Sequence, residues 1–174
     1  PDVTYLGIGL GGGVDQEVNL EQDLVPFPDQ SFDCVLCLDV LEHLDNLHAV
    51  FDDLCRVTRR HLIIALPNAW QDFWFTLRYR DYRPGVAIKF FGLPHEPPED
   101  RHKWFFSASE AASFLEYRAA KNGLSILQLD TEGDYRPKPG ILPWLRLQAL
   151  KFAGHKDYDW GALLQGTTWC VMER

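Results

Sequence analysis

The chain alternates between short apolar runs and amphipathic segments, and the two patterns predict different elements. A continuous apolar run that stops at polar residues or at a turn is typical of a strand buried on both faces of a parallel sheet. Such runs cover residues 3–10, 32–38, 61–66 and 124–129, with a shorter strand at 14–20 and a final strand at 167–173.

The amphipathic segments predict helices. In residues 46–57 the apolar positions follow the three–four spacing of a buried helical face, and Asp45 or Asn46 is placed to cap the first turn. Residues 140–154 predict another helix. Strands that alternate with helices in this way imply an α/β layered sheet.

A further helix has clear signals at both ends. Ser107 or Ser109 is placed at its N-cap, and Glu110 supplies negative charge in the first turn. Asn122-Gly123 is a fitting stop, because glycine readily adopts the left-handed conformation that ends many helices.

The length of 174 residues predicts one domain, 1–174, with a sizeable core. Residues 69–106 are the least regular part of the chain and are rich in aromatic residues, arginine and proline. This composition predicts an inserted cap on the substrate side, although most of its aromatic side chains are expected to close the core.

Charge and composition exclude several classes of protein. The net charge is −8, and residues 1–60 carry twelve acids against three bases, which disfavours nucleic acid as the main partner. No apolar run of about 18 residues predicts a membrane span. No secretory leader opens the chain, which begins with Pro1, and the cysteines form no disulfide framework. A cytoplasmic location is therefore expected.

The sequence predicts no metal site. Cys34 and Cys37 have the spacing of a metal or redox pair, but they lie inside an apolar strand, where positions three apart face opposite sides. Residues 95–102 contain several histidines and acids without the spacing of a zinc site.

Residues 26–68 combine the predicted elements in one order: strand, polar edge, helix, strand and polar edge. The first strand leads into Asp39, Glu42 and His43, and the second stops at Pro67-Asn68. This segment resembles the middle of a class I S-adenosylmethionine (SAM) dependent methyltransferase, of the group that includes the ubiquinone and menaquinone methyltransferases.

The resemblance implies a Rossmann-like fold: a mostly parallel sheet with helices on both faces and an antiparallel final hairpin. It also implies SAM as the cofactor, bound beyond the carboxyl ends of the strands. In this family the first strand ends in a glycine-rich turn, and the second ends in an acidic residue that holds the ribose hydroxyls.

Two alignments of the N-terminus compete. In one, Gly7, Gly9 and Gly11 form the glycine-rich turn after the first strand; in the other, they follow the second strand, with Gly9 in the place of the ribose acid. Only about 20 residues separate Gly11 from Phe32, whereas a single crossover unit needs about a dozen or more. Spacing therefore favours the second alignment, which predicts an N-terminally incomplete sheet and weak SAM binding.

By resemblance, the candidate cofactor-binding residues are Gly7, Gly9, Leu10, Asn19, Leu20, Leu38 and Asp39. His43 is the candidate catalytic residue, since an imidazole can act as a base near neutral pH. Arg101 and His102 are the candidate substrate-binding residues, in a loop over the site. The alternative for the turn is helix capping by Asp39 beside a surface Glu–His pair.

The sequence thus predicts SAM-dependent methyl transfer to a small-molecule or lipid-linked acceptor. The alternative is a non-catalytic methyltransferase-like domain that binds SAM weakly or not at all and acts as a binding or scaffold module. Residues 136–156 carry five bases and no acid beside apolar and aromatic residues, the pattern of an interfacial helix, which predicts peripheral membrane contact as a third alternative. The oligomeric state is left open.

Overall fold

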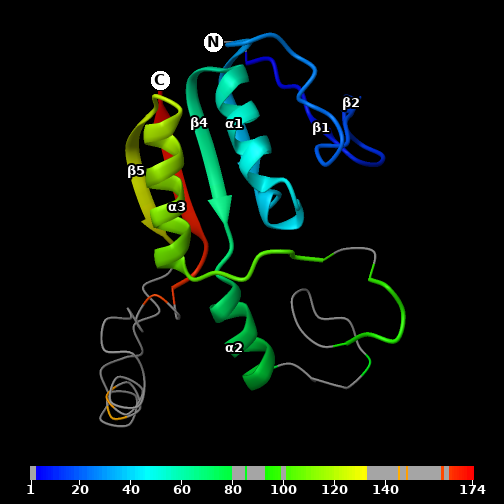
Figure 1. The fold of residues 1–174 in the computed structure, drawn as a ribbon, viewed down its shortest axis with the longest axis vertical. Coiled ribbons are helices and arrows are strands. Elements are labelled where there is room, and N and C mark those ends of the chain that lie inside the picture. Colours follow the sequence, from blue (N-terminus) through cyan, green and yellow to red (C-terminus); the bar gives the residue numbers. More distant parts are fainter. Residues whose placement is uncertain are drawn as a thin grey trace.

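The computed structural model describes residues 3–79, 85, 93–98, 101–132, 145, 148, 162 and 165–174, and Figure 1 shows how they are arranged. In chain order, its elements are β1 (Ile8–Gly9), β2 (Gln16–Glu17), β3 (Phe32–Leu38), the 3-10 turn η1 (Leu41–His43), α1 (Leu47–Val57), β4 (Thr58–Leu66), α2 (Ala69–Tyr79), α3 (Ala108–Lys121), β5 (Ser125–Thr131) and β6 (Thr168–Glu173).

Four strands form the main sheet, in the order β3-β4-β6-β5. β3 runs parallel to β4, with Val35 opposite Leu62, whereas β6 is antiparallel to both β4 and β5. The expected antiparallel final strand beside a parallel pair is therefore confirmed. The apolar runs were a good guide here because each of these strands packs its side chains into a shared core.

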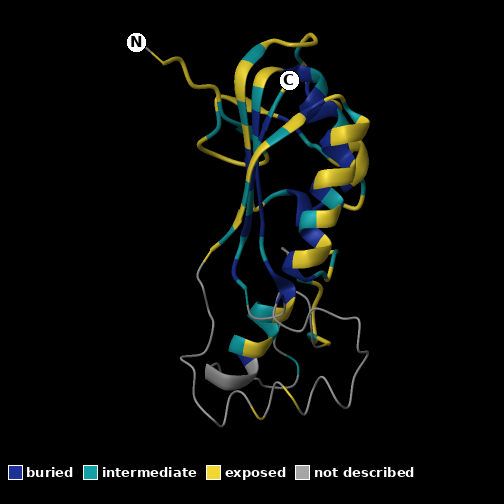
Figure 2. Ribbon diagram, turned by 90° about the vertical axis from the view of Figure 1, so that its left-hand side faces the viewer, coloured by how far each residue is buried: buried dark blue, intermediate teal, exposed yellow. Residues whose placement is uncertain are grey.

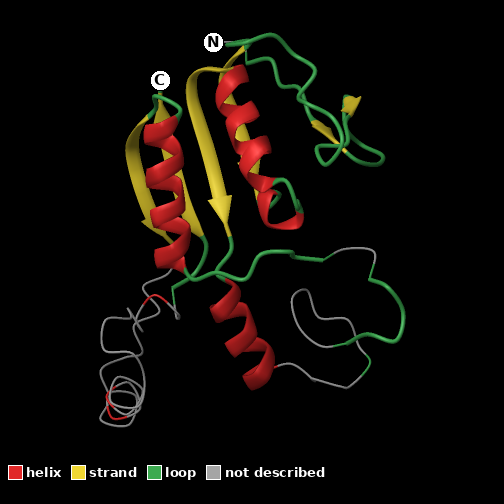
Figure 3. Ribbon diagram, in the orientation of Figure 1, coloured by secondary structure: helices red, strands yellow, loops and turns green. Residues whose placement is uncertain are grey.

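Helices α1 and α3 lie side by side on one face of this sheet (Figure 3), and the turned view in Figure 2 shows both on the same side. The apolar stripe of α1, with Phe51 fully buried, packs on Leu62 and Ile64 of β4. On β3, Leu36 and Leu38 are 52% and 39% exposed. The helices expected on the opposite face do not occur among the described residues.

The ends of α3 form as the sequence predicts. The Ser107 side chain accepts a hydrogen bond from the Glu110 backbone N–H, and the Glu110 carboxylate accepts one from the Ser107 N–H. This reciprocal capping box satisfies two backbone donors that the first turn leaves open. After Lys121 the chain leaves the helix through Gly123, whose φ of 71° is in the left-handed region.

β1 and β2 form a separate parallel pair, with Ile8 opposite Gln16. The prediction that residues 3–10 share one sheet with residues 32–38 and 61–66 is therefore wrong. Apolar content indicates that a segment prefers a strand, but not which strand lies beside it. In the described residues β3 pairs only with β4, so β3 is an edge strand.

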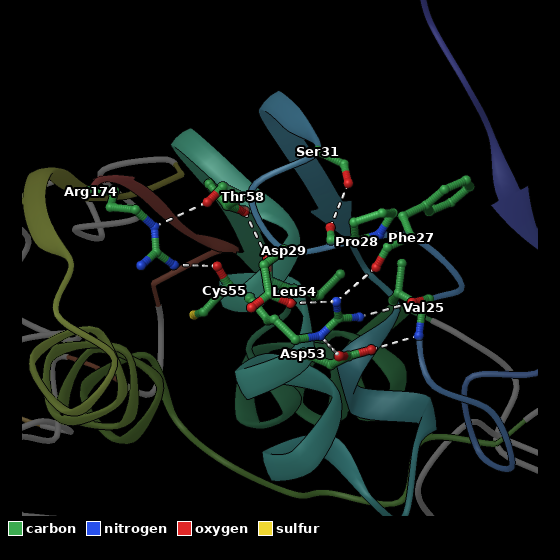
Figure 4. Close-up of polar contacts among 11 residues, drawn as sticks. Val25, Phe27, Pro28, Asp29, Ser31, Asp53, Leu54, Cys55, Thr58 and Arg174 are labelled. Carbon is green, nitrogen blue, oxygen red and sulfur yellow. Dashed lines mark hydrogen bonds and ion pairs between the residues drawn. The ribbon is translucent and has the colours of Figure 1, made fainter.

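Arg56 of α1 holds the segment that precedes β3. Its guanidinium donates to the carbonyl oxygens of Val25 (2.9 Å) and Phe27 (2.7 Å) and to the carboxylates of Asp53 (2.6 Å) and Asp29 (3.0 Å). The other Asp53 oxygen accepts the Val25 N–H. Figure 4 shows these bonds converging at the end of α1, next to the bonds from Arg174 to the carbonyl oxygens of Cys55 and Thr58.

α2 is a helix that the sequence interpretation missed, because it treated residues 69–106 as an irregular cap. The Asn68 side chain accepts the Trp70 N–H at 3.1 Å, which helps to start the helix. The helix lies beyond the carboxyl end of β4 (Figure 1). The predicted helix at 140–154 lies, apart from residues 145 and 148, outside the described residues. None of the described helices is long and apolar enough to span a membrane.

Candidate functional site

The carboxyl end of β3 opens into a turn made by Asp39 and η1. Asp39 has a φ of 53°, a left-handed conformation that aspartate adopts more readily than most residues. Its N–H still donates to the Ala65 carbonyl at 3.2 Å, which extends the parallel ladder by one bond. The turn therefore begins from a fixed strand end, and it leads directly into η1.

Three side chains meet at this turn. Glu42 and His102 are 0% and 2% exposed, and His43 is half-buried. The Glu42 Oε1 atom lies 3.6 Å from His43 Nε2 and 4.0 Å from His102 Nε2. The two imidazole rings meet edge to face, with centroids 4.4 Å apart. We call Glu42, His43 and His102 the EHH cluster.

The segment that carries His102 is fastened to η1 by its own backbone. The Lys103 N–H donates to the Glu42 carbonyl at 2.8 Å, and the Trp104 indole N–H donates to the Leu44 carbonyl at 2.7 Å. Farther along, the Phe106 carbonyl accepts the Ala69 N–H at 3.1 Å. Residues 101–106 therefore cross the strand ends as a fixed strap between η1 and α2.

A charged rim lies beside the cluster. The Lys103 ammonium bonds to the carboxylates of Glu21 and Asp45, and these hydrogen bonds raise the pKa of Lys103. The same bond from Lys103 lowers the pKa of Glu21 below its ordinary value. Asn46 donates to the Leu20 carbonyl at 2.9 Å. The turn after β2 is thereby connected to the end of β3.

The interior next to the turn disfavours further negative charge. Burial raises the pKa of the Cys37 thiol to about 12, and the nearby carboxylates of Glu42 and Asp39 add to the shift. Cys37 is therefore a neutral core residue at physiological pH.

The structure brings some of the predicted site residues together and leaves others apart. His43 and His102 are in contact, Asp39 is at the same turn, and Leu20 contacts the adjacent Asn46. Leu38 is at the end of β3, whereas Arg101 is exposed.

The remaining predicted residues lie along the β1–β2 pair. Gly7 donates its N–H to Asp15 at 2.7 Å, and the Gly9 carbonyl accepts the Val18 N–H at 2.9 Å. Leu10 is 68% exposed. Asn19, at the turn after β2, accepts the Glu21 N–H with its side-chain oxygen.

Glu42 was the residue that sequence reasoning undervalued. Its alternative description as part of a surface Glu–His pair is wrong, because Glu42 is fully buried. The burial comes from the strap, whose Lys103 and Trp104 bond to the turn from about 60 positions away. The available signal was a second histidine, His102, in the strap. No local sequence pattern connects it to His43 in the turn.

Comparisons with known proteins agree with this geometry. Residues 10–66, which run from the glycine turn after β1 to the end of β4, match the family model described as a methyltransferase domain. The chain has the class I methyltransferase fold. No curated protein matches it.

Solved structures extend this likeness over most of the length of the chain. Two structures of the methyltransferase domain of a bacterial Hen1 protein, CtHen1, match with TM-scores of 0.51 and 0.52 at 18% and 16% identity. Each match covers 91% of this chain, but the chain spans only 59% and 60% of those domains. A SAM-dependent methyltransferase from Mesorhizobium loti matches with a TM-score of 0.50 at 13% identity, over 97% of this chain and 79% of the other.

Proposed function

We propose that this methyltransferase domain transfers a methyl group from SAM to a small-molecule or lipid-linked acceptor. The observation that carries the proposal is the turn of Asp39, Glu42 and His43 at the carboxyl end of β3, inside the segment that matches the family. Ligands of open α/β sheets bind beyond the carboxyl ends of parallel strands. The strap, with His102 against His43, gives this end a second wall.

In this proposal Leu38 and Asp39 contact the cofactor, with the turn of Asn19 and Leu20 beside them. The acceptor lies on the side of the strap. Methyl transfer relies largely on orientation of the acceptor and exclusion of water, which a fixed strap provides. A small acceptor in the cytoplasm suits the charge of the chain better than a nucleic acid does, because the acidic first 60 residues would repel a phosphate backbone.

The N-terminal pair bears on cofactor affinity. A Cβ built on Gly9 would meet only Val14 Cγ1, at 3.6 Å, so Gly9 has room for a side chain. This supports the alignment in which Gly9 stands where the family has its ribose acid, rather than in a turn that requires glycine. With no carboxylate there and with β3 at the sheet edge, we expect SAM to bind weakly to these 174 residues.

Calorimetry with SAM tests the proposal in two steps. The 174-residue chain is expected to bind more weakly than low micromolar. In a version extended by a first strand with its glycine-rich turn, Gly9→Asp is expected to tighten binding about 10- to 100-fold, because hydrogen bonds to a charged group contribute about 1.5–3 kcal/mol. Gly12→Asp is the matched control, since it adds the same charge in open space one turn away and is expected to change little.

Low-micromolar binding by the 174-residue chain, or weaker binding after Gly9→Asp, would instead favour Gly7, Gly9 and Gly11 as the cofactor turn. The second candidate function is a non-catalytic module, favoured by the glycine at position 9 and by the position of β3 at the sheet edge among the described residues. It predicts that neither the added strand nor Gly9→Asp produces SAM binding.

A further inference from the structure

We propose that the EHH cluster binds one divalent transition-metal ion, of the class represented by zinc, iron and manganese. The inference goes beyond methyl transfer, because metal binding can be measured without SAM or an acceptor. If SAM fails to bind, the metal site still stands or falls on its own test.

The geometry of the cluster suits such an ion. Each of the three residues offers one ligand atom, and these atoms all lie within 4.8 Å of one another. Ligand atoms about 2.1 Å from a tetrahedral zinc ion lie about 3.4 Å apart. The 3.6 Å between His43 Nε2 and Glu42 Oε1 is close to that spacing, and the 4.0 Å to His102 Nε2 needs a shift of a few tenths of an ångström.

The donor types select the class of ion. Two imidazoles with one carboxylate are the protein ligands of many catalytic zinc sites and of non-haem iron sites, where the remaining positions hold water or a substrate oxygen. Calcium and magnesium prefer sites made entirely of oxygen ligands. The site needs no thiolate ligand. Burial raises the pKa of Cys37, the cysteine near the turn, and keeps its thiol neutral.

The cluster is also rigidly built. Glu42 and His43 come from one turn of η1, whose start is fixed by the Asp39–Ala65 bond. His102 is adjacent to Lys103, whose N–H is bonded to the Glu42 carbonyl. Because the ligands are positioned by backbone bonds rather than by flexible loops, binding an ion costs little ordering entropy.

Burial adds a reason for a cation at this point. Glu42 is fully buried, and buried charged groups in proteins are paired or coordinate metals. The side chain of His43 is 25% exposed, which leaves one side of the cluster open toward solvent for entry.

The competing explanation is a purely structural cluster, in which a protonated histidine pairs with Glu42 and fastens the strap to η1. Both explanations predict that changing His102 lowers stability. They differ in metal binding, so the decisive measurement is a titration with Co²⁺, whose visible absorption reports the ligand set.

The experiment uses the full 174-residue chain, freed of metal with a chelator and then titrated with Co²⁺. We expect saturation at one ion per chain, displacement by Zn²⁺, and a rise in melting temperature with Zn²⁺. His43→Gln, Glu42→Gln and His102→Gln are each expected to weaken Co²⁺ binding at least about tenfold, since even partners outside the ligand set contribute that much.

Two variants serve as matched controls. His61→Gln removes a histidine that pairs with Glu173 on the sheet, outside the cluster, and Cys34→Ser removes the exposed thiol. Both are expected to bind Co²⁺ as the unchanged chain does. If the buried variants fail to fold, His43→Gln, at the half-buried position, keeps the test valid. Absent saturation in the unchanged chain, or equal binding by His43→Gln and His61→Gln, overturns the proposal.

Discussion

The β3–β4 pair and the β1–β2 pair are both parallel, but they are connected in different ways. Between β3 and β4 the chain makes η1 and α1, and the helix packs on the sheet that it has crossed. Between β1 and β2 it has only residues 10–15, with Gly11 and Gly13 at φ of 90° and 103°. Parallel strands usually need a crossover of a dozen or more residues, so the short connection restricts this pair to two residues per strand.

The difference shows what holds each region. The main sheet is stabilised by apolar burial between strands and helices. The N-terminal pair is held by backbone bonds, by the Asp15–Gly7 bond and by the buried anchors Val18 and Val25. We therefore expect large effects on stability from the first region, intermediate effects from the joint between them, and local effects from the second.

The largest effect is expected from Phe51→Ala. Phe51 is fully buried, with its ring 5.6 Å from that of Phe114, and removing a buried phenylalanine typically costs about 3–5 kcal/mol. The free energy of unfolding from denaturant titration measures the loss. Leu10→Ala in the exposed N-terminal turn is the control, with an expected change within about 0.5 kcal/mol. Comparable losses in the two variants would mean that the N-terminal pair shares the core.

An intermediate effect is expected from Arg56→Met, which keeps the length of the side chain but removes the guanidinium donor to the Phe27 carbonyl; the Val25 carbonyl loses one donor and keeps the Phe27 N–H. A loss of about 1–3 kcal/mol in the free energy of unfolding follows from unsatisfied groups of this kind, with faster amide exchange in residues 25–30.

Arg59→Met is the matched control for that change. Its partner Asp33 is exposed and so is Arg59 itself, and exposed ion pairs contribute about 0–1 kcal/mol. Equal losses of unfolding free energy from Arg56→Met and Arg59→Met would show that the Arg56 bonds at the end of α1 stabilise the fold no more than an exposed ion pair does.

The smallest effect is expected from Asp15→Ala, which removes the acceptor of the exposed Gly7 N–H. The global free energy of unfolding should change by less than about 0.5 kcal/mol, while the Gly7 amide exchanges faster. Asp23→Ala, another exposed acid of this segment, should leave Gly7 exchange unaltered. A global loss above about 1 kcal/mol would contradict the view that β1–β2 is an independent local unit.

How far the sequence could predict the structure follows the same division. Phe32–Leu38 was located to the residue because polar Ser31 and Asp39 flank that run, and α3 was located because Ser107, Glu110 and Gly123 determine its ends locally. β1 was assigned to the wrong sheet because strand pairing depends on which strand lies beside it, and no local sequence pattern identifies that neighbour. α2 was missed because its aromatic residues do not show a simple apolar stripe.

The candidate site divides likewise. The turn of Asp39, Glu42 and His43 was predictable from the order of strand, polar edge and helix. Its contact with His102 was not, because the strap reaches it through backbone bonds from residues far along the chain. The burial of Glu42, on which the metal proposal depends, is a tertiary property for the same reason.

The exposed side of β3 has a practical consequence for labelling. Cys34 and the buried Cys37 lie three positions apart and face opposite sides of this strand. Cys34 is the exposed cysteine of the four. Burial raises the pKa of Cys37 and Cys55 to about 12 and that of Cys170 to about 11, so these three thiols hold almost no reactive thiolate at pH 8. A fluorophore coupled through a maleimide should therefore attach at Cys34 in the folded protein. Its emission would then report directly when another segment or molecule covers this edge of the sheet.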